Sequence, residues 1–134
     1  MTNLNELFVK RSNPDTIAQP VGKYSHVTKI SRNAEWYVFS GQIGTDSKGD
    51  IPADFNQQVV HTMDNIAKVL ASQQLTPDHV VKINIWAVDP IDWDFFDRVW
   101  EKTFGPTPPS MTIAYVQALG LPEIKIELDV WAAG

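Results

Sequence analysis

Residues 123–132 read EIKIELDVWA, and this segment decides the fold because its apolar and polar residues alternate without interruption. Successive side chains of a strand point to opposite faces of its sheet. One face of the predicted strand therefore carries only aliphatic residues, whereas the other carries Lys125, Glu127, Asp129 and Trp131. The aliphatic face needs a covering layer, and the opposite face presents two carboxylates and a tryptophan.

Three further segments are typical of strands, and the region before them predicts a fourth. Residues 80–88 (VVKINIWAV) alternate in the same way. Residues 35–43 (EWYVFSGQI) and 111–119 (MTIAYVQAL) are rich in β-branched and aromatic residues. We also expect a strand at about residues 23–31.

Helical periodicity marks two segments between these strands. Over residues 54–73 apolar side chains recur every three or four positions, with Asp54 placed as N-cap. Residues 91–104 repeat this spacing, with Asp92 as N-cap and Gly105 after the last turn. The order β-β-α-β-α-β-β predicts an α+β fold in which both helices cover one face of an antiparallel or mixed sheet.

Length and composition favour a single domain over residues 1–134. The chain has 134 residues, 43% of them hydrophobic, and contains no cysteine, which excludes disulfides, thiolate zinc sites and cysteine nucleophiles. Neither a signal peptide nor a membrane-spanning run is evident, so we expect a cytoplasmic protein without a membrane partner. A net charge of −5 with scattered cations argues against a nucleic-acid partner.

No metal or cofactor site is predicted. His26, His61 and His79 are dispersed and show none of the spacings typical of metal ligands. Residues 41–44 (GQIG) lack the spacing of a nucleotide-binding loop. His26 follows Tyr24 and Ser25, and a functional role for it stays open.

The non-aliphatic sheet face is too aromatic to be left in water. The residues predicted on it are Trp36, Val38, Asn84, Trp86, Tyr115 and Trp131. Large exposed apolar patches mark association, and so we expect a homo-oligomer with small-molecule clefts at its subunit interfaces.

Glu127 lies in the middle of the last predicted strand, on the face that association would bury. Burial raises a carboxyl pKa and suits the group to general acid or base catalysis. An inter-subunit hydrogen bond or salt bridge is an equally good interpretation of the same position. Asp129, two residues further on, is better explained as a solvated charge at the strand end.

Several segments together carry a family resemblance. They are GKYSH at 22–26, VFSGQIG at 38–44, QQ at 57–58 with NI at 65–66, VVKI at 80–83, the segment 89–104, and EIKIE at 123–127. From about residue 18 onward the chain resembles the Rid family, the YjgF-like reactive intermediate deaminases. This resemblance implies a chorismate-mutase-like subunit, a homotrimer whose sheets line a central barrel, and hydrolysis of enamines or imines with release of ammonia in clefts between subunits.

The resemblance also implies roles for individual residues. Glu127 would position the attacking water, Ser40 matches the serine at a strand end, and Tyr24 would close the pocket. Thr112 would complete the pocket, with Asp97 and Trp100 near its rim.

Two positions depart from the family pattern. Ser110 stands where active members carry an arginine that binds the substrate carboxylate, and Asp97 replaces an asparagine. A serine cannot supply the fixed charge of a guanidinium. Both changes disfavour an anionic 2-iminocarboxylate, so we expect a neutral or cationic imine or enamine instead. Arg98 or Arg32 could supply a displaced anchor, although helix spacing does not establish that either reaches the cleft.

Two other function classes compete with this hypothesis. The first is a non-catalytic trimer that binds a small metabolite, for which Ser110 and Asp97 would be natural. The second, a ribonuclease, is least favoured because the acidic chain has no stripe of aromatic and basic residues.

Overall fold

A four-stranded mixed sheet forms the centre of the computed structural model, which describes residues 8–134. The strand order is β3-β6-β4-β5, with bounds Trp36–Val38, Ile126–Ala133, Val80–Ala87 and Ser110–Tyr115. β6 runs antiparallel to β3 and β4, whereas β5 runs parallel to β4. The predicted α+β fold with a mixed sheet is therefore confirmed.

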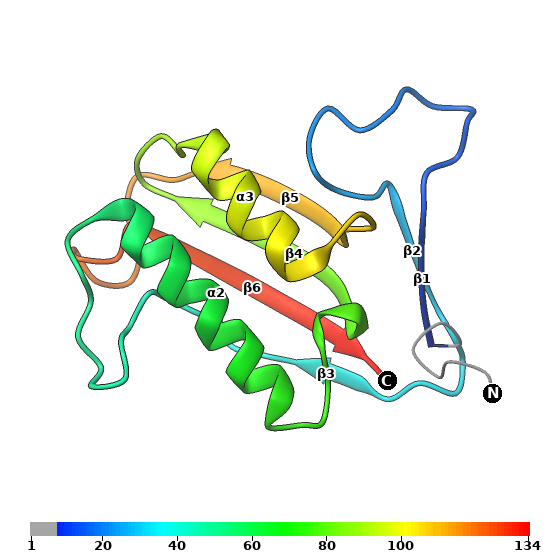
Figure 1. Ribbon diagram of the computed structural model, residues 1–134, viewed down its shortest axis with the longest axis horizontal. Coiled ribbons are helices and arrows are strands. Elements are labelled where there is room, and N and C mark those ends of the chain that lie inside the picture. The colour runs from blue at the N-terminus through cyan, green and yellow to red at the C-terminus, as the bar shows by residue number, and fades with distance from the viewer. Residues whose placement is uncertain (1–7) are drawn as a thin grey trace.

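Both helices cover the same face of this sheet (Figure 1). They are α2 (Phe55–Ala71) and α3 (Trp93–Phe104), and Asp54 and Asp92 cap them as predicted. A short 3-10 helix, η1 (Pro77–His79), leads from α2 into β4. The core lies between the helices and the aliphatic sheet face, and its fully buried members include Val59, Ile66, Leu70, Ile83, Ile85, Trp100, Ile126 and Leu128.

The N-terminal region differs from the prediction. β1 (Val9–Ser12) pairs antiparallel with β2 (Val27–Ile30) in a separate two-stranded sheet. The strand expected over 23–31 is thus shorter and does not join the main sheet. Apolar alternation does not predict β1, because its four residues, VKRS, show almost none.

Arg11 fixes β1 against the rest of the molecule. Its guanidinium donates hydrogen bonds to the backbone carbonyls of Thr107, Pro77 and Val80 at 2.7, 2.7 and 2.8 Å. Burial lowers the pKa of Arg11 to about 10, although the charge of Asp78 acts in the opposite direction. Arg11 thus adds three hydrogen bonds to the apolar contacts that Val9 makes with Val81 and Ala133.

The other differences concern strand ends. The predicted strand 35–43 is regular only at residues 36–38, although Gln42 still bridges to Leu128 of β6. The predicted strand 111–119 ends at Tyr115, and the last strand runs over 126–133 rather than 123–132. Gly120 and Pro122 lie in the turn region between these two strands, as predicted.

The sheet face turned away from the helices, called the outer face below, is aromatic as predicted. Trp36, Val38 and Trp131 are exposed on it, with Val38 69% exposed. The prediction is wrong for Tyr115, because its pairing with Ala87 places it on the helix-covered face with Met111 and Ile113, where its Oη accepts a hydrogen bond from the backbone N–H of Ile91 at 3.2 Å. Trp36 and Trp131 meet edge to face, with ring centroids 6.5 Å apart. Within residues 8–134, no helix has the length and apolar character needed to cross a membrane.

Candidate functional site

Glu127 lies in the middle of β6 on the outer face, opposite Trp86 of β4. Its carboxylate packs directly against the backbone of Gly41, so closely that a Cβ at residue 41 would overlap it. Only glycine leaves room for this approach. The loop that follows β3 therefore fixes one side of the Glu127 carboxylate.

Partial burial raises the pKa of Glu127, and the negative charge of Asp129 raises it further. Asp129 is held in place, because its Oδ2 accepts a hydrogen bond from Nε1 of Trp86 at 2.9 Å. Such a carboxyl retains its proton to a higher pH than an exposed glutamate does. Glu127 is therefore suited to accept and return a proton.

Three hydroxyl residues predicted for the site belong to β5 or to the loop beside Glu127. Ser110 and Thr112 share the outer face with Glu127, since strand pairing places them in register with Lys82 and Asn84. Oγ of Ser110 shares a hydrogen bond of 2.7 Å with Oγ1 of Thr28, and Nζ of Lys82 donates to Oγ1 of Thr112 at 2.8 Å. Ser40 is exposed and directly precedes Gly41.

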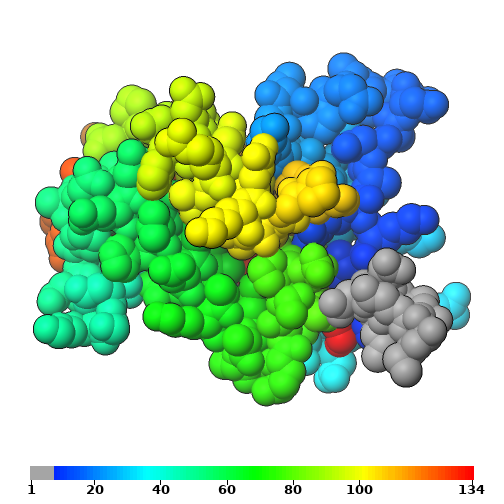
Figure 2. Space-filling model, viewed as in Figure 1, coloured from blue at the N-terminus to red at the C-terminus, as the bar shows by residue number. Residues whose placement is uncertain are grey.

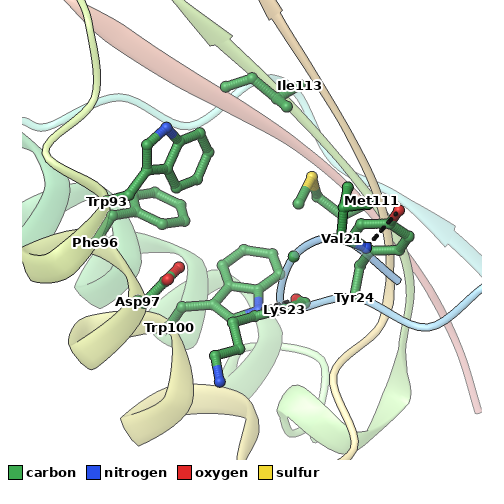
Figure 3. A pocket seen from close by; sticks show the side chains of 10 residues that line it. Val21, Lys23, Tyr24, Trp93, Phe96, Asp97, Trp100, Met111 and Ile113 are labelled. Atoms are coloured by element: carbon green, nitrogen blue, oxygen red, sulfur yellow. Dashed lines mark hydrogen bonds between the residues drawn. The ribbon is translucent and has the colours of Figure 1, made fainter. Parts of the chain in front are cut away.

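A cavity of about 310 Å³ lies on the other side of β5, where the loop before β2 faces α3 (Figure 3). Tyr24, Asp97 and Trp100 all line it, so the structure brings these three predicted residues together. The remaining lining residues are Val21, Gly22, Lys23, Trp93, Phe96, Met111 and Ile113. A volume of this size is at the lower end of the range for small-molecule sites.

Aromatic rings form the floor of this cavity. Trp100 and Phe96 stack with centroids 5.6 Å apart, and Trp93 meets Phe96 edge to face at 5.4 Å. Nε1 of Trp100 donates to the carbonyl of Lys23 at 2.7 Å, which ties the loop to α3. Tyr24 completes the set from the loop, where its ring also contacts His26 edge to face at 5.7 Å.

Two charged residues line the cavity, Asp97 on α3 and Lys23 on the loop before β2. Desolvation raises the pKa of Asp97, and the nearby Lys23 partly offsets this effect. Nζ of Lys23 forms an ion pair with Oε1 of Glu101 at 2.9 Å. Arg98 lies over the ring of Phe95, with its Cζ 5.9 Å from the centroid, and does not line the cavity.

The predicted site residues thus form two groups within one chain. Glu127, Ser110 and Thr112 share the outer face, whereas Tyr24 lines the cavity on the opposite side of β5. The single chain does not bring Tyr24, Thr112 and Glu127 into one pocket. Arg32 does not line the cavity either.

Sequence reasoning missed several lining residues. The apolar spacing of 91–104 predicts a packed helix face that includes Phe96, and Phe96 is buried. Trp93, however, is 37% exposed at the N-terminus of the helix, which is unusual for a core tryptophan. Among residues 8–134, no group of three or more His, Cys, Asp or Glu side chains could hold a metal ion.

The fold and these two groups of residues define a class of protein: an α+β subunit with two helices on one sheet face and a carboxylate on the aromatic other. A solved structure with this fold is the Rid-family protein YyfB of Yersinia pestis, described as being of unknown function. It superimposes with a TM-score of 0.82 at 24% identity, covering 92% of this chain and 97% of that one.

The sequence comparisons agree with this fold. The family model described as Endoribonuclease L-PSP matches residues 15–134. A RutC family protein of Saccharolobus solfataricus is 28% identical over 116 residues, which is 85% of this chain and 89% of that protein. The yeast protein HMF1 of Saccharomyces cerevisiae is 34% identical over 115 residues, covering 82% and 83%. This chain belongs to the Endoribonuclease L-PSP family, also called the YjgF or Rid family.

Proposed function

We propose that this protein hydrolyses imines or enamines that lack a carboxylate, releasing ammonia, in the cytoplasm. The observation that carries this proposal is the Glu127 carboxylate, which is partly buried against Gly41 and has a raised pKa. The proposed compartment fits a chain that contains no cysteine for disulfides.

The proposed reaction needs only water and proton transfer. An enamine first tautomerises to the imine. Glu127 then accepts a proton from water as the oxygen attacks the imine carbon, and it returns this proton to the imine nitrogen, which gives the carbinolamine. In a second transfer Glu127 takes the hydroxyl proton of the carbinolamine and delivers it to the nitrogen, so that the C–N bond breaks, ammonia leaves and a carbonyl product remains. No cofactor takes part in these steps.

Ser110 supports a substrate without a carboxylate. Its hydroxyl is already engaged by Thr28 at 2.7 Å, and it carries no charge that could pair with an anion. Loss of a charged hydrogen bond to an anionic substrate costs about 2–5 kcal/mol of binding, or about 30-fold to several thousand-fold in affinity. The carboxylated substrates implied by the family resemblance are therefore disfavoured.

The proposed active form is a homotrimer with clefts between its subunits. The aromatic outer face is exposed on the single chain, and association of subunits would bury it. The separation of the Glu127 group from the Tyr24 cavity within one chain supports a cleft to which two subunits contribute. Sites at subunit interfaces are a common solution for small-molecule binding.

A second candidate is a trimer that binds a small metabolite without converting it. The engagement of Ser110 by Thr28 and the negative charge of Asp97 both favour this alternative, because neither assists attack on a carboxylated imine. Cleavage of RNA, which the family description suggests, is opposed by the net charge of −5.

A panel of imines tests the proposal. Imines without a carboxylate are generated in the assay by an amine oxidase, and carboxylated ones by an amino-acid oxidase, and ammonia release is followed with each. We expect the wild type to accelerate hydrolysis only of the imines without a carboxylate. We expect Ser110→Arg, but not the uncharged control Ser110→Gln, to gain activity on the carboxylated ones. A wild type inactive on the whole panel would favour the binding protein.

A further inference from the structure

We propose that the cavity between α3 and the loop before β2 binds a small organic cation with an apolar body, such as a protonated imine or amine. This inference rests on the proposed function in one respect, because it takes the cavity as the substrate-binding part of the same site. It commits to a positive charge, which the proposed function leaves open.

The shape and lining of the cavity are the first support. Four aromatic residues line it: Tyr24, Trp93, Phe96 and Trp100. Aromatic rings attract cations through the negative potential of their faces, and tryptophan is the strongest of them. The aliphatic side of the cavity, formed by Met111 and Ile113, suits the apolar body of such a ligand. A purely hydrophobic ligand would fit this lining too, so the charged groups at the cavity distinguish a cationic ligand from an uncharged one.

Asp97 supplies the deciding charge. Among residues 8–134 it is the only carboxylate that lines the cavity, and Figure 3 shows its side chain beside the aromatic residues of α3. Desolvation already penalises this charge, as the raised pKa of Asp97 indicates. A cationic ligand would relieve that penalty by pairing with the carboxylate, whereas an anion would increase it.

Lys23 does not cancel this preference. It is the one cation among the lining residues, and its ammonium pairs with Glu101, which lies outside the cavity. Figure 3 shows the ammonium turned away from the ring of Tyr24 and toward the C-terminal part of α3. Taken together, Lys23, Asp97 and Glu101 carry a net negative charge, so the local field favours a cation.

Binding of three probes of similar size tests this inference without any turnover. The probes are choline, its uncharged carbon isostere 3,3-dimethylbutan-1-ol and the anion 3,3-dimethylbutanoate, and binding is measured by calorimetry and by tryptophan fluorescence. We expect choline to bind at least about tenfold more tightly than the alcohol, which corresponds to about 1.4 kcal/mol. We expect the anion to bind most weakly.

Variants assign the effect to the cavity. Asp97→Asn should weaken choline binding about tenfold and leave the binding of the alcohol unchanged. The matched control is Asp64→Asn, which removes an exposed carboxylate on α2, outside the cavity, and should change neither. Equal affinity for choline and the alcohol, no binding of any probe, or equal losses in the two variants would overturn the inference.

The result of these binding measurements can be told apart from the result of the imine hydrolysis assay. Selective binding of choline by a protein that hydrolyses no imine would support the cation site and contradict the hydrolase. Hydrolysis of uncharged imines by a protein that shows no preference for choline would support the hydrolase and contradict the cation site.

Discussion

Glu127 and Gly41 form the pair on which the proposed chemistry depends. The alternation of residues 123–132 was enough to place Glu127 on the outer face. Its contact with Gly41 could not be predicted, because it joins a loop and a strand that are 86 positions apart in the chain. Tyr24, Asp97 and Trp100 line one cavity, whereas Trp93, which lines it too, was not among the predicted site residues because helical spacing alone does not distinguish a core residue from a cavity wall.

A methyl group at residue 41 should disable Glu127 without unfolding the protein. Gly41→Ala would displace the carboxylate, and so we expect imine hydrolysis to fall at least about tenfold, as a misplaced proton-transfer group does. Gly120→Ala is the matched control, because no atom lies within 4 Å of a Cβ built there. Equal activity of the two variants, measured by ammonia release, would show that the contact has no role.

The acid side of the pH profile should report the coupling of Glu127 to Asp129. Because burial and Asp129 both raise the pKa of Glu127, the carboxylate form needed to activate water is lost at a higher pH than for an exposed glutamate. Asp129→Asn removes one of these causes, so the acid limb of kcat/KM should shift to lower pH. Glu123→Gln, on an exposed residue before β6, should leave the limb in place. A limb that does not move in Asp129→Asn would argue against Glu127 as the titrating group.

At the level of elements, patterns of apolar residues predicted α2, α3 and the four strands of the main sheet. They failed at β1, where only Val9 packs into an apolar cluster, with Val81 and Ala133, and Arg11 anchors the strand by hydrogen bonds. They also failed at strand ends, where hydrogen bonds to distant segments decide how far pairing extends. Gln58 is a further example, since a buried glutamine inside a helix is invisible to hydrophobic periodicity.

Gln58 joins α2 to the segment that enters β6. Its Nε2 donates to the carbonyls of Pro52 and Glu123 at 2.8 and 2.9 Å, and its Oε1 accepts from the backbone N–H of Lys125 at 2.9 Å. Gln58→Ala leaves these groups without their partner, and so we expect the free energy of unfolding to fall by about 2–4 kcal/mol.

Urea unfolding at a fixed protein concentration measures this loss. The neighbouring Gln57→Ala is the control, since that side chain is exposed, and its effect should stay within about 0.5 kcal/mol. If both variants unfolded at the same urea concentration, the hydrogen bonds of Gln58 would contribute nothing to stability.

On the scale of the whole molecule, the exposed aromatic outer face is the feature that a single chain leaves unexplained. The space-filling view in Figure 2 shows the opposite side, where α2 and α3 and their side chains cover the sheet. The sequence predicted this two-sided character from alternation alone. It could not predict which residues from two subunits meet, because that depends on their relative placement.

Disruption of the outer face should prevent assembly. Trp131 is 44% exposed on that face, and Trp131→Glu would place a charge in the proposed interface, so we expect the homotrimer to dissociate to monomers. Val60→Glu is the control, because Val60 is 37% exposed on α2, away from the outer face. Analytical ultracentrifugation at micromolar concentration distinguishes the species. A monomeric wild type would contradict the proposed assembly.

We expect Glu127 to promote hydrolysis of an imine without a carboxylate. The measurement is the rate of ammonia release from an imine generated by an amine oxidase, compared between wild type and Glu127→Gln, which keeps the shape of the side chain and removes its charge. We expect the variant to lose about 100-fold or more of the rate acceleration, the contribution typical of a general base, while Glu123→Gln retains the wild-type rate. Undiminished hydrolysis by Glu127→Gln would contradict the account.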